Sequence, residues 1–244
     1  MRLFRSLAGA PVTVALASAC VLLVAAPASA SPSRPASKVL TANCPYNGVH
    51  YYAYGSSGYG SNKGTGAEAL TWTNWSLNGH SDGFSDEAVW TIDNNNQNDA
   101  LEVGFSTGIS QNGGFSNNMY PYYTLNNGAN EYDTFSTELP KDTDIWMSAT
   151  SNGSQSWAYI YNKYYANAIP YGVSTPRLNY EQSEVNYHDI WMGGGSGSDI
   201  ALEYQNTSNQ WYDWGYINGS ADSPYWIDLY QPNGADEGGY GTSC

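Results

Sequence analysis

The chain has 244 residues, with 22 acidic and 8 basic side chains and a formal net charge of −14 at pH 7. Such an acidic chain offers no basic surface for nucleic acid or an anionic membrane, and we expect neither as a partner. Aromatic residues make up 15% of the chain, including 22 Tyr and 9 Trp, and Gly and Asn are abundant, which is typical of β-rich proteins.

The first thirty residues have the pattern of a secretory signal peptide. Arg2 and Arg5 form a positive start, residues 11–26 are mostly apolar, and residues 28–30 (Ala-Ser-Ala) provide the small side chains that signal peptidase requires. Cleavage after residue 30 leaves six basic and 22 acidic residues, a net charge of −16. We therefore expect a secreted, extracellular protein, because no other stretch approaches the ~20 apolar residues of a membrane helix.

The rest of the chain reads as one domain. Residues 31–43 are rich in Ser, Pro and Ala without an apolar period, which predicts a short disordered leader. From residue 44 to residue 244 the composition is even, with neither an internal repeat nor a linker. Because β-sandwiches of ~200–250 residues often form a single unit, we expect one all-β domain, and we expect it to be monomeric.

Two cysteines remain after removal of the signal peptide, which contains Cys20. Cys44 and Cys244 lie at the two ends of the predicted domain, and an exported chain meets oxidising conditions. We therefore predict a disulfide bond between them. Closing a loop of about 200 residues would stabilise the fold by ~4–5 kcal/mol in the chain-entropy model.

Short alternating runs of Tyr, Trp, Val and Ile, separated by Gly- and Asn-rich turns, predict a succession of β-strands. The first is 67–75, and the next two, 88–92 and 100–106, flank an Asn-rich run as a hairpin. The remaining predicted strands are 120–125, 144–149, 155–161, 177–185, 189–192, 200–205 and 226–230. About ten strands in one domain indicate an antiparallel two-sheet β-sandwich or jelly roll.

Several common kinds of site find little support in the sequence. No Gly-x-Ser-x-Gly motif is present, and His80 lies in a Gly-containing turn where we expect it to be exposed. Because no His-x-x-x-His or Cys-x-x-Cys pair is present, zinc is not expected. The oxygens of residues 93–99 would suit calcium, but a hairpin turn is the commoner explanation of such a run. We expect neither a metal nor a cofactor.

Carbohydrate binding is a serious alternative function. Tryptophan, tyrosine and asparagine side chains can stack on sugar rings and hydrogen-bond to their hydroxyls. Most of these aromatic residues also alternate as strands require, so packing in the core is the commoner explanation of any single one of them. The tryptophans concerned are Trp72, Trp75, Trp146, Trp157, Trp191, Trp211, Trp214 and Trp226.

Two glutamates interrupt runs that otherwise read as half-buried strands. Glu102 alternates with Leu101 and Val103, so it points to the opposite face, where Trp90 of the preceding strand would lie beside it. Glu184 alternates with its own neighbours in the same way. A carboxyl group in a partly apolar cleft has a raised pKa that suits acid/base chemistry, and a pair of them can activate water. Two solvent-facing acids on outer strand faces would produce the same pattern.

Two motifs resemble the neprosin family of glutamic peptidases. Residues 84–90 (Phe-Ser-Asp-Glu-Ala-Val-Trp) and 101–105 (Leu-Glu-Val-Gly-Phe) are similar to that family's Ser-x-x-x-x-Trp stretch and Ile-Glu-Val-Gly-Trp-like element. Residues 64–70 look like its Tyr-x-Gly-Ala-x-Ala strand. More distantly, the spacing is similar to that of the Trp and Gln of fungal eqolisin peptidases, where the catalytic Glu follows at an interval close to the 82 positions that separate Glu102 and Glu184.

The resemblance implies a concanavalin-like sandwich with acid-active endopeptidase activity on polypeptides. By this match Glu102 and Glu184 are the two catalytic residues, without an assignment of which is base and which is acid, and Trp90 lines the site. The second glutamate departs from the family's Gly-Gly-Glu-Val pattern, and Glu181 competes with it, although Glu181 would face the other way. A non-catalytic carbohydrate-binding sandwich and a polysaccharide-degrading enzyme remain as alternatives.

Overall fold

The computed structural model describes residues 44–45, 47–58, 62–70, 77–109, 115–127, 131–135, 137–140, 143–161, 163–169, 172–192, 198–232 and 234–239. The predicted signal peptide (1–30) and leader (31–43) lie outside the described residues, as do Trp72, Trp75 and Cys244. Within the described ranges the regular structure is all β, and no helix is long and apolar enough to cross a membrane.

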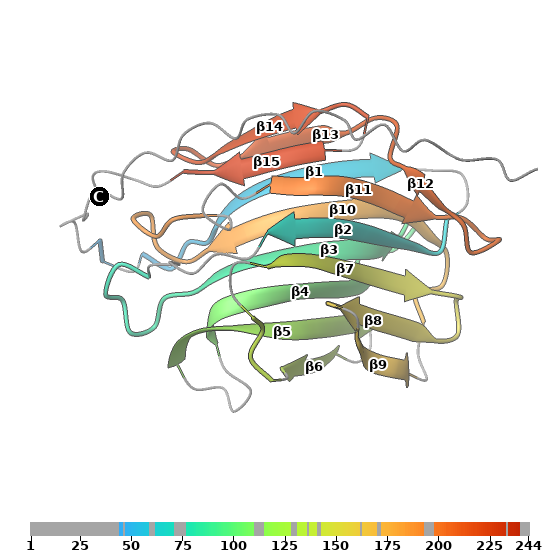
Figure 1. Cartoon of the computed structure of the whole chain (residues 1–244), viewed down its shortest axis with the longest axis horizontal. Helices are drawn as coiled ribbons and strands as arrows, with labels where there is room; N and C mark the ends of the chain where they lie inside the picture. Colours follow the sequence, from blue (N-terminus) through green and yellow to red (C-terminus); the bar gives the residue numbers. More distant parts are fainter. Residues whose placement is uncertain are drawn as a thin grey trace, which may run out of the picture. The chain divides into compact units, whose positions relative to one another are not determined.

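Fifteen strands in the described part of the chain form two antiparallel sheets, and the axes of most strands are roughly aligned in Figure 1. The spatial order of the first sheet is β13 (Asn218–Ala221), β1 (Tyr51–Gly58), β10 (Pro176–Val185), β3 (Ser85–Asp93), β4 (Asp99–Ile109), β5 (Phe115–Asn127) and β6 (Glu131–Phe135). The order of the second is β14 (Trp226–Tyr230), β15 (Gly234–Gly238), β11 (Ser198–Gln205), β2 (Gly64–Leu70), β7 (Asp144–Ser151), β8 (Ser156–Ile160) and β9 (Lys163–Ile169), with β12 (Trp211–Asp213) paired to β11.

The two sheets pack face to face around a hydrophobic core, which confirms the predicted antiparallel β-sandwich. The inner face of the first sheet contributes Val89, Leu101, Val103, Phe105 and Leu125, and that of the second contributes Ala67, Ile145, Met147, Ile160 and Leu202. Because side chains alternate along a strand, the residues between these core positions point away from the core. Each sheet therefore has an outer face whose side chains do not pack in the core between the sheets.

The predicted hairpin is confirmed. Strands β3 and β4 pair with Trp90 directly opposite Glu102. The Asn-rich run between them forms a turn in which Asp93 Oδ1 accepts hydrogen bonds from the backbone N–H groups of Asn95 (2.6 Å) and Asn96 (2.9 Å). Such side-chain-to-backbone bonds are the usual reason for Asp and Asn in turns.

One predicted strand, 189–192, is wrong. These residues follow a turn, and among them only Met192 makes a β-bridge, to Gly239. The carboxylate of Asp189 is buried and accepts hydrogen bonds from the Cys44 backbone N–H (3.4 Å) and the Asn78 side chain. These bonds anchor the segment as a loop, although it contains a short apolar run of a kind that also occurs in buried strands.

His80 is not the exposed turn residue that the sequence predicts. Its ring stacks on Tyr187 with the centroids 3.7 Å apart, its Nε2 lies 2.8 Å from Asp189 Oδ1, and its side chain is only 9% exposed. The turn that contains His80 is folded onto the loop after β10, where the backbone N–H of Phe84 donates to Asn186 Oδ1 at 2.8 Å. Tertiary packing therefore covers a histidine that local sequence places at the surface.

The predicted disulfide bond between Cys44 and Cys244 is not tested by the described residues. Cys44 is buried, with 4% of its surface exposed. Its proposed partner, Cys244, lies outside the described residues. The pairing of the two chain ends stays a prediction.

Candidate active site

Three carboxyl groups lie on the open face of the first sheet. Glu184 of β10 is directly opposite Asp86 of β3, and Glu102 of β4 is directly opposite Trp90 of β3. Asp86 and Trp90 are four positions apart on one strand, so both cross-strand rows project from the same face. The core-facing Val89 lies between them on the other face. The sheet thus gathers acids that are far apart in sequence.

The two acidic rows are separated by a row whose two middle residues are small. The row between them contains Gln182, Ala88, Gly104 and Tyr122, in order across β10, β3, β4 and β5. A Cβ atom on Gly104 would lie 2.3 Å from the carbonyl oxygen of Glu87 and 2.7 Å from the Cβ of Ala88. Both distances are far below van der Waals contact. The sheet surface between the two acidic rows is therefore recessed here, and position 104 cannot hold a residue larger than glycine.

Glu184 is held by hydrogen-bonding groups around both carboxylate oxygens. Its Oε1 contacts Nδ1 of His50, and its Oε2 accepts a hydrogen bond from Gln182 Nε2 at 3.2 Å. The hydroxyl of Tyr52, the direct neighbour of Glu184 on β1, also hydrogen-bonds to it. The Glu184 side chain is 16% exposed and that of His50 is 37% exposed, so solvent can reach this end of the site.

Burial and these partners act on the pKa of Glu184 in opposite directions. Burial raises the pKa above its ordinary value, whereas the imidazole of His50 and the hydroxyl of Tyr52 lower it in part. Burial, followed by the negative charge of Glu184, raises the pKa of Tyr52 to about 12. Tyr52 therefore keeps its proton at acidic and neutral pH and donates to the carboxylate.

Asp86 interacts electrostatically with both Glu184 and Glu102. Burial, followed by the negative charges of Glu184 and Glu102, raises the pKa of Asp86 well above its ordinary value. Glu102 accepts a 2.6 Å hydrogen bond from the hydroxyl of Tyr122, and burial with the charges of Asp86 and Glu102 raises the pKa of Tyr122. Because like charges at close range resist joint ionisation, the cluster retains a proton, and the raised pKa of Asp86 makes this group suited to hold it.

Aromatic rings border the acidic cluster. Trp90 meets Tyr180 edge to face with the ring centroids 6.4 Å apart, and Tyr180 stacks on Tyr54 at 5.1 Å. At the other end, the ring of His50 meets Phe84 edge to face at 5.2 Å. The acids are thus flanked by apolar surface, which accounts for their burial.

The structure brings the predicted residues Glu102, Glu184 and Trp90 to one sheet face. Glu181 points to the other face, as predicted. It is fully buried, and its Oε2 is the nearest atom, at 2.7 Å, to a Cβ built on Gly55 of the neighbouring strand. The competing assignment of Glu181 therefore places a carboxyl group away from the open face.

The cluster also contains four residues that the sequence does not predict as part of the site: Asp86, His50, Tyr52 and Tyr122. A signal for Asp86 exists, because it lies four positions before Trp90, and a start of the predicted strand 88–92 two residues earlier would place both on one face. No local pattern indicates His50, which precedes a strand that the sequence does not predict. Among the described residues, no three His, Cys, Asp or Glu side chains are grouped so that they could hold a metal ion.

No protein-family model and no curated protein sequence matches the chain. Among solved structures, scytalido-glutamic peptidase with a peptide-based transition-state analog has a TM-score of 0.54 at 11% identity, over 78% of this chain and 98% of that chain. A second structure of that peptidase, with a transition-state analog inhibitor, has a TM-score of 0.51 at 10% identity, over 77% and 97% of the two chains. At these identities the likeness shows a shared fold alone.

Proposed function

We propose that the protein is a secreted, acid-active glutamic endopeptidase of the neprosin kind, which hydrolyses peptide bonds with Glu102, Glu184 and an activated water. The observation that carries the proposal is the acidic cluster on the open sheet face, in which Glu184 is held by His50, Tyr52 and Gln182. The solved peptidase of the same fold binds a peptide-based transition-state analog, which supports a polypeptide substrate here. Secretion rests on the predicted signal peptide.

Glu184 is the better candidate for the general base. A base must be ionised when water arrives, and hydrogen bonds from the imidazole of His50 and the hydroxyl of Tyr52 favour the ionised form. Its partial exposure leaves room for a water molecule beside the carboxylate. Glu184 would remove a proton from that water as the oxygen attacks the scissile carbonyl carbon.

Glu102 is then the general acid. In its protonated form Glu102 would donate a hydrogen bond to the developing oxyanion and then transfer its proton to the leaving nitrogen as the C–N bond breaks. The proton that Glu184 took from water returns to solvent or to Glu102 and restores the starting state. Trp90, directly opposite Glu102, would line the substrate-binding surface.

Asp86 would regulate the charge of this pair. It lies beside Glu184 and holds a proton more strongly than an ordinary aspartate. While Asp86 is neutral, the cluster has one negative charge fewer, and Glu184 can ionise without a charged neighbour directly opposite. At higher pH, ionisation of Asp86 would restore a negative charge opposite Glu184 and the general acid would lose its proton, which predicts activity confined to acidic pH.

The test is digestion of a denatured protein substrate at acidic pH by the wild type and single variants. Glu102→Gln and Glu184→Gln keep shape and hydrogen bonding but remove the titratable group, so each should lower kcat/KM by roughly 10²–10⁴-fold. Glu138→Gln is the matched control, because Glu138 is an exposed glutamate whose Oε2 accepts a 3.0 Å hydrogen bond from Asn118. Full activity in Glu102→Gln would end the proposal.

A further inference from the structure

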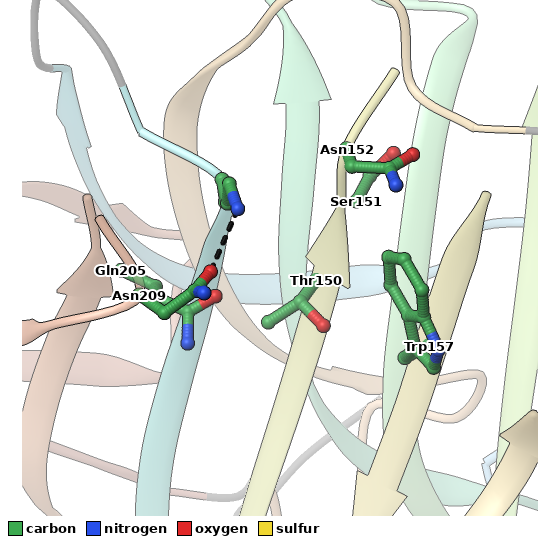
Figure 2. Close-up of a pocket in the computed structure, with 7 residues that line it drawn as sticks. Thr150, Ser151, Asn152, Trp157, Gln205 and Asn209 are labelled. Atoms are coloured by element: carbon green, nitrogen blue, oxygen red, sulfur yellow. Dashed lines mark hydrogen bonds between the residues drawn. The ribbon is translucent and has the colours of Figure 1, made fainter. Parts of the chain in front are cut away.

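A cavity of about 400 Å³ lies on the second sheet, on the face turned away from the core. Trp157 of β8 forms one wall, and Gln205 and Asn209 stand on the opposite side with Thr150 between them (Figure 2). Asn152, at the end of β7, borders the cavity at the top of the view in Figure 2. The acidic cluster lies on the other sheet, so the two sites do not share residues.

The sheet register explains why the cavity exists. Gln205, Gly64, Thr150 and Trp157 form one cross-strand row over β11, β2, β7 and β8. Neighbouring strands are ~4.8 Å apart, so the two ends of the row are separated by about 14 Å. Gly64 has no side chain in this row, and a Cβ there would lie 2.3 Å from the carbonyl oxygen of Ala149 and 2.5 Å from Cγ2 of Thr150, so the position admits no larger residue. The result is a slot with an indole wall and an amide wall.

The polar wall is fixed before any ligand binds. Lys63 Nζ donates a 2.7 Å hydrogen bond to Asn209 Oδ1. The backbone of Lys63 is tied on both sides, since its N–H donates to Gln205 O and its carbonyl accepts from Ser151 N–H, both at 2.6 Å. Asn209 has φ of 63°, a left-handed conformation that Asn tolerates better than most residues. Pre-organised groups of this kind lose little freedom on binding.

We infer that this cavity binds a sugar ring of a neutral polysaccharide. The face of a pyranose ring can stack on Trp157, and the side-chain amides of Asn152, Gln205 and Asn209 can pair with its hydroxyls. Amides suit hydroxyl groups because each amide carries both donors and an acceptor, as a hydroxyl does. The lining therefore matches the alternation of apolar faces and hydroxyl edges in carbohydrate.

Charge favours a neutral glycan over an acidic one. Lys63 is the one charged residue among those that line the cavity, and its ammonium group is already engaged by Asn209. The chain as a whole has a net charge of −14, so it repels a polyanion at long range. This inference goes beyond the proposed peptidase activity and does not depend on it, because the catalytic cluster lies on the other sheet.

The test is affinity electrophoresis of the wild type in native gels that contain soluble β-glucan, xylan, galactomannan or polygalacturonate. At least one of the three neutral polymers should retard the protein. Trp157→Ala should weaken that interaction by at least about ten-fold, and so should Asn209→Gly, which keeps the left-handed backbone but removes the amide. Trp226→Ala is the matched control, because Trp226 is 40% exposed on β14 and does not line the cavity.

Thermal melting of each variant distinguishes loss of binding from loss of folding. If Trp157→Ala does not fold, Asn209→Gly alone tests whether the cavity binds the polymer. Glu184→Gln should bind as the wild type does, so a failed peptidase proposal leaves this one standing. The inference is overturned if no neutral polymer retards the wild type, if polygalacturonate alone does, or if folded Trp157→Ala and Asn209→Gly retain full retardation. Loss of binding in Trp226→Ala would also overturn it.

Discussion

Glu184 and Asp86 are direct cross-strand neighbours on the open face of the first sheet. Two like charges directly opposite each other would destabilise an antiparallel pair. The pair is compatible with a stable sheet because Asp86 retains its proton over a wider pH range than an ordinary aspartate, while His50 and Tyr52 stabilise the charge of Glu184. One member is thus suited to hold a proton and the other to accept one.

The first prediction concerns stability against pH. Burial and the neighbouring carboxylates raise the pKa of Asp86 in the folded state above the ordinary value of 3.8, so the folded protein binds this proton more tightly than the unfolded chain does. The stability gained in this way is complete below that ordinary value and is lost as pH rises through the raised folded value. Asp86→Asn should not show this loss, and its Tm should exceed that of the wild type near neutral pH.

Thermal unfolding followed by circular dichroism from pH 3 to pH 7 measures this difference. Asp228→Asn is the control, because Asp228 is an exposed aspartate on β14. Its Tm should follow that of the wild type at each pH. Parallel curves for Asp86→Asn and the wild type would show that Asp86 has the same pKa in the folded and unfolded states.

The second prediction concerns the contact between His50 and Glu184. His50 lowers the pKa of Glu184 against the effect of burial, so His50→Gln should raise the pKa of this carboxyl group. Less of the base is then ionised at acidic pH, and the acid limb of the kcat/KM profile should move to higher pH. At the wild-type optimum, the kcat/KM of His50→Gln should be several-fold lower. At pH values above the shifted acid limb, the kcat/KM values of the variant and the wild type should become similar.

A second histidine offers a matched control for this profile. His188 packs against Tyr51, with the ring centroids 5.3 Å apart, on the loop after β10. His188→Gln should leave the acid limb in place even if it lowers overall stability. Should His50→Gln lower activity equally at every pH, His50 would have a structural role alone.

The third prediction concerns Gly104, which lies in the row between the two acidic rows. Gly104→Ala would place a methyl group 2.3 Å from the carbonyl oxygen of Glu87, which a backbone shift must relieve. We expect a destabilisation of about 1–3 kcal/mol, as for other overpacked positions, together with a loss of peptidase activity. Gly58→Ala is the control, because its Cβ would approach no atom closer than the carbonyl oxygen of Arg177 at 4.0 Å. Urea unfolding and kcat/KM measure both effects.

The hairpin that presents Trp90 and Glu102 could be predicted because it is local. Alternation fixes which face each residue uses, and an Asn-rich turn fixes the pairing. The pairing of strands distant in sequence and the conformations of loops could not be predicted in this way. The opposition of Asp86 and Glu184 joins segments almost a hundred positions apart, and no local pattern specifies their register.

Two errors show how tertiary contacts override local patterns. Strand β1 reads Tyr-Tyr-Ala-Tyr-Gly-Ser-Ser-Gly, and its Gly and Ser content is atypical of a strand, so the sequence does not predict it or the His50 site that precedes it. Residues 189–192 contain a short apolar run that could be a strand, yet the buried carboxylate of Asp189 anchors them in a loop. Partners from other segments decided the conformation in both cases.

The fourth prediction concerns the chain ends. Cys44 and Cys244 should form a disulfide in the secreted protein, because export exposes both to oxidising conditions. Peptide mapping by mass spectrometry without reduction should find the two peptides linked, and Edman or mass analysis of the N-terminus should locate the cleavage after Ala30. Two alkylatable thiols in the native secreted protein would contradict the pairing. Reduction should lower Tm by roughly 8–20 °C, in line with a contribution of ~4–5 kcal/mol for so long a loop.

The last prediction uses the two glutamates together. If Glu184 removes the proton from water and Glu102 supplies one to the leaving nitrogen, each step is useless without the other. The double variant Glu102→Gln/Glu184→Gln should then be scarcely less active than the slower single variant, because residues that act as a unit fail together. Independent roles would instead multiply the two losses, so that two ~10³-fold effects would give a ~10⁶-fold loss.

Measuring kcat/KM for the wild type, both single variants and the double variant completes this cycle. Glu181→Gln provides an internal comparison, since Glu181 is buried on the core face and its loss should act through stability with kcat/KM of the folded fraction preserved. A multiplicative double variant would mean that Glu102 and Glu184 do not act on the same step. In that case Asp86, which lies directly opposite Glu184, becomes the candidate partner of the base, and Asp86→Asn/Glu184→Gln should show the non-additivity instead.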